Sequence, residues 1–304
     1  MKTVFAGAVE GSRIALDALI GAGLAPALVV TLPPSAAGRH SDFSDLTSVA
    51  EAAGIEVHHT QTINGAATIA ALRALEPDLA MVIGWSQICK QEFRSVAKLG
   101  CIGFHPAPLP RLRGRAVIPW TILLGETESA STLFWLDEGT DSGPILLQRR
   151  FELSPEESAR GLYDKHTANL AAMLPEAVGL VARGAPPRVG QDHSKATYCA
   201  KRTPEDGLID WREPAAAILR FIRAVGEPYP GAFAFHNEDK IVIDKARLFS
   251  GSHQYIGLTG QVQNHTAEGF TVRCGDGNMI EVQSWRTPRG GKPGVHSRLT
   301  GACR

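Results

Sequence analysis

The chain lacks several features that would assign it to a class at once. Its 31 Lys and Arg residues balance 31 Asp and Glu residues, so no excess of charge points to nucleic acid or an anionic membrane as the main partner. No apolar run approaches the ~18 residues that a membrane span needs. The five cysteines are scattered and never spaced C-x-x-C, which excludes a disulfide scaffold and a zinc knuckle.

The usual nucleotide and hydrolase motifs are missing as well. There is no G-x-x-x-x-G-K-[ST], no G-x-G-x-x-G after a strand and no G-x-S-x-G. These absences argue against a P-loop kinase, a dinucleotide-dependent oxidoreductase and an α/β-hydrolase. The adjacent His58 and His59 would point to opposite faces of a strand, so they do not predict a shared metal. We expect no metal site.

What is present is a chain of 304 residues, long enough for two domains of ~100–200 residues each. In its first half, short β-branched runs alternate with helical patterns. We expect strands at 3–6, 27–31, 56–59, 79–83 and 101–104, and helices at 12–22, 46–53, 66–75 and 91–97. This alternation predicts a parallel sheet covered by helices on both faces.

The second half changes character after a Pro/Gly-rich break at 184–189. Before the break we expect extended segments at 130–136 and 145–151 and a helix over 154–182 that opens on Ser154-Pro155-Glu156-Glu157. After it, a helix at 213–225 precedes short strands with the spacing of a small barrel. The predicted division is a catalytic domain at 1–185, a linker at 186–203, a C-terminal domain at 204–290 and a mobile tail at 291–304.

Two polar clusters could carry chemistry. In GFHPAPLPRLRGR, residues 103–115, His105 directly follows a predicted strand, where open α/β sheets place ligand sites. In DEGTDSGP, residues 137–144, three carboxylates lie within five residues. A carboxylate beside His105 would fix the tautomer of an acid–base histidine. Taken separately, a structural histidine and an acidic turn stay open as alternatives.

The segments GFHPAPLPRLRGRAVIPW, TLFWLDEGTDSGPILLQ, KRTPEDGLIDW and RAVGEPYPGAFAF together resemble the formyltransferase family that uses 10-formyltetrahydrofolate. The resemblance covers about residues 1–290 in the same order. It implies an α/β fold with a Rossmann-like, doubly wound, mostly parallel sheet, followed by a smaller OB-like C-terminal β-barrel. It also implies a transferase that takes its formyl group from 10-formyltetrahydrofolate without a metal.

The resemblance carries site residues over to this sequence. It implies that His105 and Asp141 are catalytic. Two segments would line the folate pocket: Gly84, Trp85, Ser86, Gln87 and Ile88, and Leu136, Asp137, Glu138, Gly139 and Thr140. The acceptor amine would lie against Pro106, Arg113, Gly114 and Arg115.

One position departs from the family pattern. The family has Asn-x-His-Pro at this strand end, whereas this chain has Gly103-Phe104-His105-Pro106. The family's Asn donates a hydrogen bond to the developing oxyanion, and losing one such donor costs ~10²–10³ in rate. Ser86, Gln87, a backbone N–H or a water could replace it. Otherwise the protein is a catalytically impaired relative that binds folate or a nucleotide sugar.

The identity of the acceptor amine stays open at this point. A tRNA substrate calls for a basic surface, but the stretch 32–45 holds one Arg against two Asp. We therefore expect the amine of a nucleotide-linked amino sugar, of the kind used for surface polysaccharides, with methionyl-tRNA as the alternative. The N-terminal residues are too polar for a signal peptide, and the scattered cysteines suit a reducing compartment. We expect a cytoplasmic enzyme without a membrane partner, with a homodimer as one option.

Overall fold

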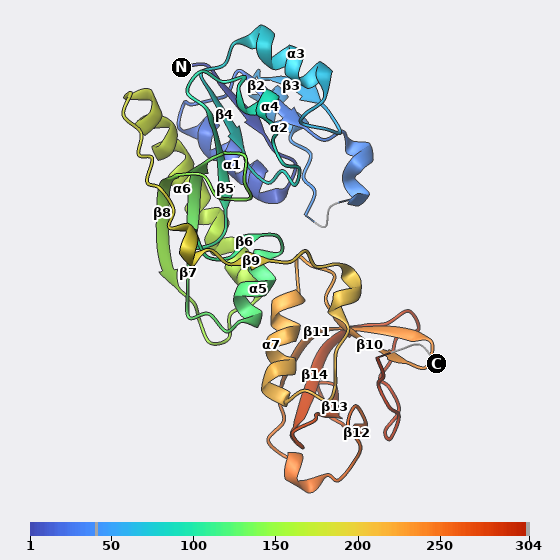
Figure 1. Ribbon diagram of the computed structural model, residues 1–304. Helices are drawn as coiled ribbons and strands as arrows, with labels where there is room; N and C mark the ends of the chain where they lie inside the picture. Colours follow the sequence, from blue (N-terminus) through green and yellow to red (C-terminus); the bar gives the residue numbers. More distant parts are fainter. Residues whose placement is uncertain (40–41, 302–304) are drawn as a thin grey trace. The chain divides into compact units, whose positions relative to one another are not determined.

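The computed structural model describes residues 1–39 and 42–301. The parts of the sequence predictions that concern His40, Ser41 and the last three residues lie outside the described residues. The chain divides into two compact units, which Figure 1 shows in colours that follow the sequence. The first unit holds Met1–Val117, Glu128–Leu153 and Tyr163–Ala200, and the second holds Ile118–Thr127, Ser154–Leu162 and the chain from Lys201 onward.

The first unit is built on a seven-stranded sheet in the order β3-β2-β1-β4-β5-β7-β8. Its first five strands are parallel to one another, and β7 and β8 are antiparallel to their neighbours. The strands are β1 Thr3–Ala6, β2 Leu28–Thr31, β3 Glu56–His59, β4 Leu79–Val82, β5 Cys101–His105, β7 Glu128–Trp135 and β8 Ile145–Glu152. This confirms the mostly parallel α/β sheet predicted from the sequence.

Helices follow the strands as the alternating pattern predicted. They are α1 Glu10–Gly21, α2 Thr47–Ala52, α3 Ala66–Leu75, α4 Gln91–Arg94, α5 Val117–Leu123 and α6 Ala159–Ala182, with short 3-10 turns η1 Pro34–Arg39 and η2 His193–Lys195. Residues of β1 alternate between two buried clusters. Phe5 packs with Leu16 of α1 and Met173 of α6, whereas Val4 packs with Leu72 of α3. The sheet is therefore covered on both faces, which makes it doubly wound.

The strand order reverses between β1 and β4, since β2 and β3 lie on one side and β5 on the other. Ligands of open α/β sheets bind at the carboxyl ends of strands at such a reversal. At this edge the hydroxyl of Ser12 donates to the carbonyl of Ile83 at 2.6 Å. A Cβ at Gly7 would lie 2.6 Å from that same carbonyl, so glycine lets the two strand ends approach closely.

The second unit contains a five-stranded antiparallel sheet in the order β10-β11-β14-β13-β12. Its elements are α7 Ala215–Val225, β10 Ala232–His236, β11 Asp239–Leu248, β12 Val262–His265, β13 Phe270–Arg273 and β14 Met279–Arg286, with the 3-10 turns η3 Pro204–Gly207 and η4 Ser252–Gln254. This sheet forms an antiparallel half-barrel, which confirms the β-barrel-like C-terminal domain predicted from the resemblance.

The helix predicted at 91–97 is shorter and ends at Arg94, and two other segments differ more from the sequence predictions. The helix expected from position 154 begins at Ala159, because the Ser154 amide and the Glu157 carboxylate close a separate turn at 3.1 Å. Within the expected tail, the amide of His296 donates to Val262 on β12, and the amide of Phe235 on β10 donates to Thr300. This stretch therefore pairs with both edge strands of the half-barrel. Backbone pairing of this kind leaves no apolar period in the sequence.

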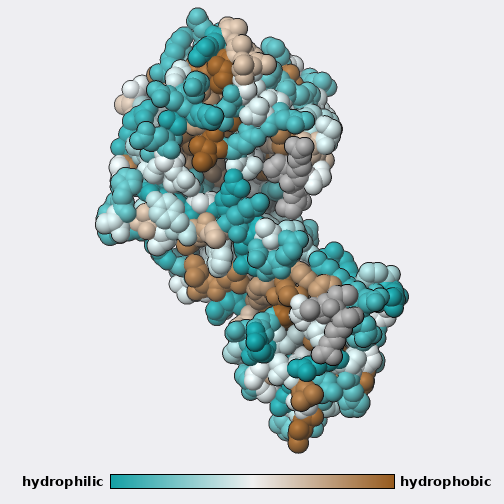
Figure 2. Space-filling model, turned by 45° about the vertical axis from the view of Figure 1, so that its right-hand side comes forward, coloured by the Kyte–Doolittle hydropathy of each residue, from teal (hydrophilic) through white to brown (hydrophobic). Residues whose placement is uncertain are grey.

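No helix of the described residues has the length and apolar composition that crossing a membrane requires. The face of the molecule in Figure 2 is mainly hydrophilic, with hydrophobic residues in smaller areas. The most exposed large apolar side chain is Ile256, at 98%.

Candidate active site

His105 is the last residue of β5, beside β4 and close to the strand reversal. Its side chain is buried, with 5% exposed. Nε2 lies 2.7 Å from the carbonyl oxygen of Leu112. Because a carbonyl only accepts hydrogen bonds, Nε2 carries a proton. In the neutral ring, Nδ1 is then the nitrogen with the free lone pair, and it faces Asp141 Oδ2 at 3.6 Å.

The backbone conformation at Leu112 orients its carbonyl toward His105. Leu112 has a φ of +58°, in the left-handed region that residues other than glycine rarely adopt. Its amide donates to the hydroxyl of Thr197 at 2.9 Å, and the next amide, of Arg113, donates to the carbonyl of Thr197 at 2.8 Å. Thr197 therefore holds the unusual conformation that places an acceptor against His105. Because the acceptor is a backbone atom, no residue type in the sequence signals it.

Asp141 joins the two polar clusters identified in the sequence. Its Oδ2 accepts a hydrogen bond from the amide of Gly114 at 2.8 Å. Gly114 has a φ of +101°, and a Cβ there would lie 2.6 Å from the carbonyl oxygen of Cys199. Only glycine allows this approach. The structure thus brings His105, Gly114 and Asp141 together.

The rest of residues 137–144, which we call the acidic loop, stabilises its own turn. Asp137 Oδ1 accepts from the hydroxyl of Ser142 at 2.7 Å and from the amide of Gly139 at 3.1 Å. A Cβ at Gly143 would lie 1.8 Å from the carbonyl oxygen of Trp135, which is a forbidden contact. Glu138, Gly139 and Thr140 are exposed, and Leu136 is half-buried. The carboxylate of Asp137 therefore shapes this loop.

The other predicted folate segment, Gly84 to Ile88, follows β4 at the strand reversal. The side chain of Gln87 binds a neighbouring loop: its Nε2 donates to the carbonyl of Gln61 at 2.8 Å, and its Oε1 accepts from the amide of Ile63 at 2.9 Å. The side chain of Trp85 is half-buried, and that of Ile88 is 65% exposed. Because an amide nitrogen has two N–H donors and only one of them binds Gln61, Gln87 stays a candidate to replace the missing Asn.

The two arginines assigned to the acceptor behave differently. Arg115 is exposed, and its Nη2 donates to the carbonyl of Ser86 at 3.0 Å, so it reaches the predicted folate segment. Arg113 is 1% exposed. It donates to Gln191 Oε1 from Nε at 3.2 Å and from Nη2 at 2.6 Å, and to Tyr198 from Nη1 at 3.1 Å. A guanidinium this deeply buried presents no surface to an acceptor, so we retain only Arg115 for that role.

A larger residue at position 103 would require neighbouring side chains to move. Gly103 is buried, and a Cβ there would lie 2.7 Å from Leu136 Cδ2 and 3.3 Å from Phe134 Cε1. Apolar side chains therefore occupy the space beside this strand position. Pro106, the other residue assigned to the acceptor, is half-buried in the turn directly after His105.

Sequence reasoning missed the role of the stretch between α6 and the second unit. Residues 197–199 do not form a linker but pair with residues 106–115, which we call the arginine loop: β9 Tyr198–Cys199 lies parallel to β6 Arg113–Gly114. Gln191, 8% exposed, belongs to the same stretch. A lone Gln or Thr in a Pro/Gly-rich segment gives no pattern that would have found them.

Burial shifts the pKa of several thiols and of one histidine outside this site. Burial raises the pKa of the thiols of Cys89, Cys101 and Cys274 to about 12, so these cysteines are protonated and unreactive. Burial also lowers the pKa of His166 to about 3. Among the described residues, no group of three or more His, Cys, Asp or Glu side chains could hold a metal ion.

Two family models match the chain. The model described as formyl transferase covers residues 2–178, and the model described as formyl transferase, C-terminal domain, covers residues 201–301. The chain belongs to the formyl transferase family. It is a formyltransferase that depends on 10-formyltetrahydrofolate, as the sequence resemblance implied.

Curated relatives extend over nearly the whole enzyme. It is 32% identical over 282 residues to the methionyl-tRNA formyltransferase of Moorella thermoacetica, covering 92% of this chain and 90% of that one. It is 34% identical over 295 residues to that of Stutzerimonas stutzeri, covering 96% and 92%. A similar fold occurs in an N-formyltransferase from Helicobacter canadensis in complex with folinic acid and dTDP-3-aminofucose, with a TM-score of 0.68, 20% identity and coverage of 93% and 99%.

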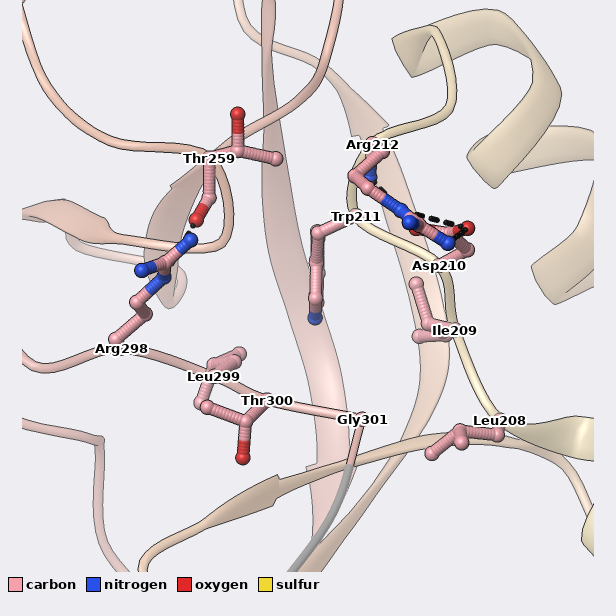
Figure 3. Close-up of a pocket in the computed structure, with 10 residues that line it drawn as sticks. All are labelled: Leu208, Ile209, Asp210, Trp211, Arg212, Thr259, Arg298, Leu299, Thr300 and Gly301. Carbon is pink, nitrogen blue, oxygen red and sulfur yellow. Dashed lines mark hydrogen bonds and ion pairs between the residues drawn. The ribbon is translucent and has the colours of Figure 1, made fainter.

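The second unit of the formyltransferase has a pocket of its own, about 400 Å³ in volume. Figure 3 shows the indole of Trp211 between Arg298 and the ion pair of Arg212 with Asp210. Arg298 Nε donates to the carbonyl of Thr259 at 3.0 Å. None of the residues predicted for formyl transfer lines this pocket.

Proposed function

We propose that the enzyme transfers the formyl group of 10-formyltetrahydrofolate to a primary amine beside His105, with Asp141 as the partner of that histidine. The arrangement of His105 carries the proposal. Leu112 holds Nε2 at 2.7 Å, which leaves Nδ1 as the proton acceptor, and the carboxylate of Asp141 lies 3.6 Å from Nδ1. An imidazole fixed in one tautomer, with its basic nitrogen beside a carboxylate, suits general base catalysis.

His105 moves one proton in this reaction. The amine nitrogen bonds to the formyl carbon, and Nδ1 takes the proton that the nitrogen must lose. The bond from that carbon to the folate nitrogen then breaks, and the proton passes to the leaving nitrogen. While the proton resides on Nδ1, the ring is a cation between the Leu112 carbonyl and the Asp141 carboxylate, both of which stabilise it.

The folate would lie along the carboxyl edge of β4 and β5. When bound, it supplies the formyl group. The hydrogen bonds that Asp137 accepts come from within residues 137–142 and fix the turn of this loop. On that turn Glu138, Gly139 and Thr140 are exposed, so they are accessible to the heteroaromatic ring of a folate. Trp85 offers a half-buried aromatic face after β4. These features fit a folate, and Arg115 reaches the same edge through its contact with Ser86.

The first candidate acceptor is the amino group of methionyl-tRNA. Its support is the set of curated relatives, which are methionyl-tRNA formyltransferases aligned over more than nine-tenths of this chain. This shifts the preference away from the amino sugar expected from sequence. A balanced net charge weighs little against relatives of this coverage, because a tRNA contacts only one part of a protein surface.

The second candidate is a nucleotide-linked amino sugar. The stretch 32–45, with one Arg against two Asp, supports it, since phosphate-rich RNA favours basic segments. Arg115 could bind the diphosphate of such a substrate, because a guanidinium pairs well with phosphate oxygens.

One assay separates these candidates. The enzyme is incubated with 10-formyltetrahydrofolate and either methionyl-tRNA or a panel of UDP- and dTDP-linked amino sugars, and release of tetrahydrofolate is followed. Release with the charged tRNA supports the first candidate, and release with a sugar alone supports the second. If folate binds but no amine is formylated, Gly103 marks a catalytically impaired relative and the proposal fails.

A further inference from the structure

A buried glutamine outside the predicted site links the two loops that hold the site residues. Oε1 of Gln191 accepts both hydrogen bonds from Arg113 described above. Its Nε2 donates to the carbonyl oxygen of Asp141 at 2.9 Å and to that of Gly143 at 2.7 Å. A single side chain thus connects the arginine loop to the acidic loop.

The chemistry of its partners allows only one orientation of this amide. A guanidinium has donors and no acceptor, and a carbonyl oxygen has only acceptors. Rotating the amide of Gln191 by half a turn would lose all four hydrogen bonds. The two bonds from the charged guanidinium are also of the stronger, charge-assisted kind. Gln191 therefore binds the backbone of Asp141 in one fixed orientation.

The backbone conformation of Asp141 requires stabilisation by its surroundings. Its φ of +49° lies in the left-handed region, where a non-glycine residue persists only if its surroundings hold it. Its carboxylate is held by the amide of Gly114, and its own carbonyl is held by Gln191. Rotation of this backbone would swing the carboxylate away from His105.

We propose that Gln191 is a positioning residue for formyl transfer, acting by fixing the backbone of Asp141 so that its carboxylate faces His105 Nδ1. This inference rests on the proposed roles of His105 and Asp141. Gln191 touches none of the reacting atoms, and its carbonyl partners, Asp141 and Gly143, lie outside the predicted folate residues 136–140. Its removal should therefore lower kcat by a larger factor than it raises the KM for 10-formyltetrahydrofolate.

The first test compares two buried glutamines. Gln191→Met should lower kcat by about 10- to 100-fold, since small displacements of catalytic groups have effects of this size. Gln191→Glu should lose as much, because a carboxylate still accepts from Arg113 but cannot donate to the two carbonyls. Gln263→Met is the matched control: Gln263 is 7% exposed and lies on β12 of the second unit. Equal kinetics for Gln191→Met and Gln263→Met would overturn the proposal.

The second test asks whether Gln191 acts through Asp141. In an Asp141→Asn background, Gln191→Met should reduce kcat by less than about threefold, because interacting residues are not additive. Full additivity of the two losses would show an effect independent of Asp141 and would contradict the proposal.

A third measurement does not depend on activity. Amide hydrogen exchange across residues 137–144 should accelerate at least tenfold in Gln191→Met and stay unchanged in Gln263→Met. Unchanged exchange in both variants would rule out positioning of the loop, even in a protein that formylates no tested amine. Failure of the proposed function, seen as absent turnover in the unmodified enzyme, is thus distinguishable from failure of this inference.

Discussion

The loop after β5 and the half-barrel of the second unit use arginine in different ways. In the loop, Arg113 is buried and binds neutral partners, Gln191 and Tyr198, that connect it to other segments. In the half-barrel, Arg286 pairs with Asp244 at 2.8 Å and Arg247 pairs with Glu281 at 2.7 Å, with both arginines more than half exposed. Buried Arg113 organises the site loops. The pair of Arg286 with Asp244 lies at the surface and contributes little to folding, whereas Arg247 neutralises the buried carboxylate of Glu281.

The comparison also bears on the acceptor. The balanced net charge includes Arg113, which is buried, and Arg247 and Arg286, whose charges are neutralised by carboxylates. Counting charges along the sequence therefore does not reveal which cations could meet a tRNA or a diphosphate. Arg115 is exposed at the edge of the predicted folate segment, and we propose it as a cation that binds an anionic acceptor.

The largest effect within the site loops is expected from Asp141→Asn. Asn tolerates the left-handed backbone and retains an oxygen for the amide of Gly114, so the change removes the charge while preserving the fold. We expect kcat for formyl transfer to fall at least a hundredfold, within the ~10²–10⁴ range of acid–base catalysis. Steady-state release of tetrahydrofolate measures this, with an unchanged melting temperature as the control. An active Asp141→Asn enzyme would leave His105 without its assigned partner.

Arg113→Met and Arg115→Met should separate the two arginines of the loop. Loss of the Arg113 guanidinium leaves buried Gln191 Oε1 without a donor, which costs ~1–3 kcal/mol for each unsatisfied group. We expect the free energy of unfolding to fall by about 2 kcal/mol or more for Arg113→Met, measured by urea denaturation. Arg115→Met should change it by less than ~0.5 kcal/mol and instead raise the KM for the acceptor. Equal destabilisation by both substitutions would contradict the difference in burial.

Gly103→Asn restores the residue that the family pattern has at this position, but it requires Leu136 to move. Its Cβ would lie 2.7 Å from Leu136 Cδ2, and overpacking of this kind costs ~1–3 kcal/mol. We expect a lower urea midpoint for Gly103→Asn and a smaller loss when it is introduced together with Leu136→Ala. A stable, more active Gly103→Asn single variant would show that Leu136 moves aside readily.

The smallest effect is expected on the half-barrel side of the comparison. Arg286 is 64% exposed where it pairs with Asp244, and exposed pairs contribute ~0–1 kcal/mol. Arg286→Ala should lower the free energy of unfolding by no more than about 1 kcal/mol and leave formyl transfer unchanged. A loss as large as that of Arg113→Met would remove the contrast between the two regions.

Most strands and helices could be predicted from the sequence because the strands are short apolar, β-branched runs and the helices have an apolar period. Thr3–Ala6 and Ala66–Leu75, for example, have the predicted bounds. The start of α6 could not, since Ser154 and Glu157 form a turn whose residues resemble a helix N-cap. The pairing of His296 and Thr300 with the edge strands depends on backbone groups, which leave no trace in side-chain pattern.

For the candidate site, the meeting of His105 with Asp141 was expected from the resemblance, and the structure places the two side chains together. What holds them could not be predicted. The carbonyl of Leu112 depends on a left-handed backbone fixed by Thr197, and Gln191 is a single amide in a segment that we interpreted as a linker. Such contacts arise only when distant parts of the chain pack together. Burial of Arg113 has the same origin.

The central claim is that Nδ1 of His105 accepts the proton of the attacking amine. Its most direct test is a single-turnover measurement of tetrahydrofolate release by His105→Ala, with enzyme and acceptor amine in excess over 10-formyltetrahydrofolate. The account predicts a rate constant at least a hundredfold below that of the unmodified enzyme, with folate binding retained. A rate constant equal to that of the unmodified enzyme would contradict it.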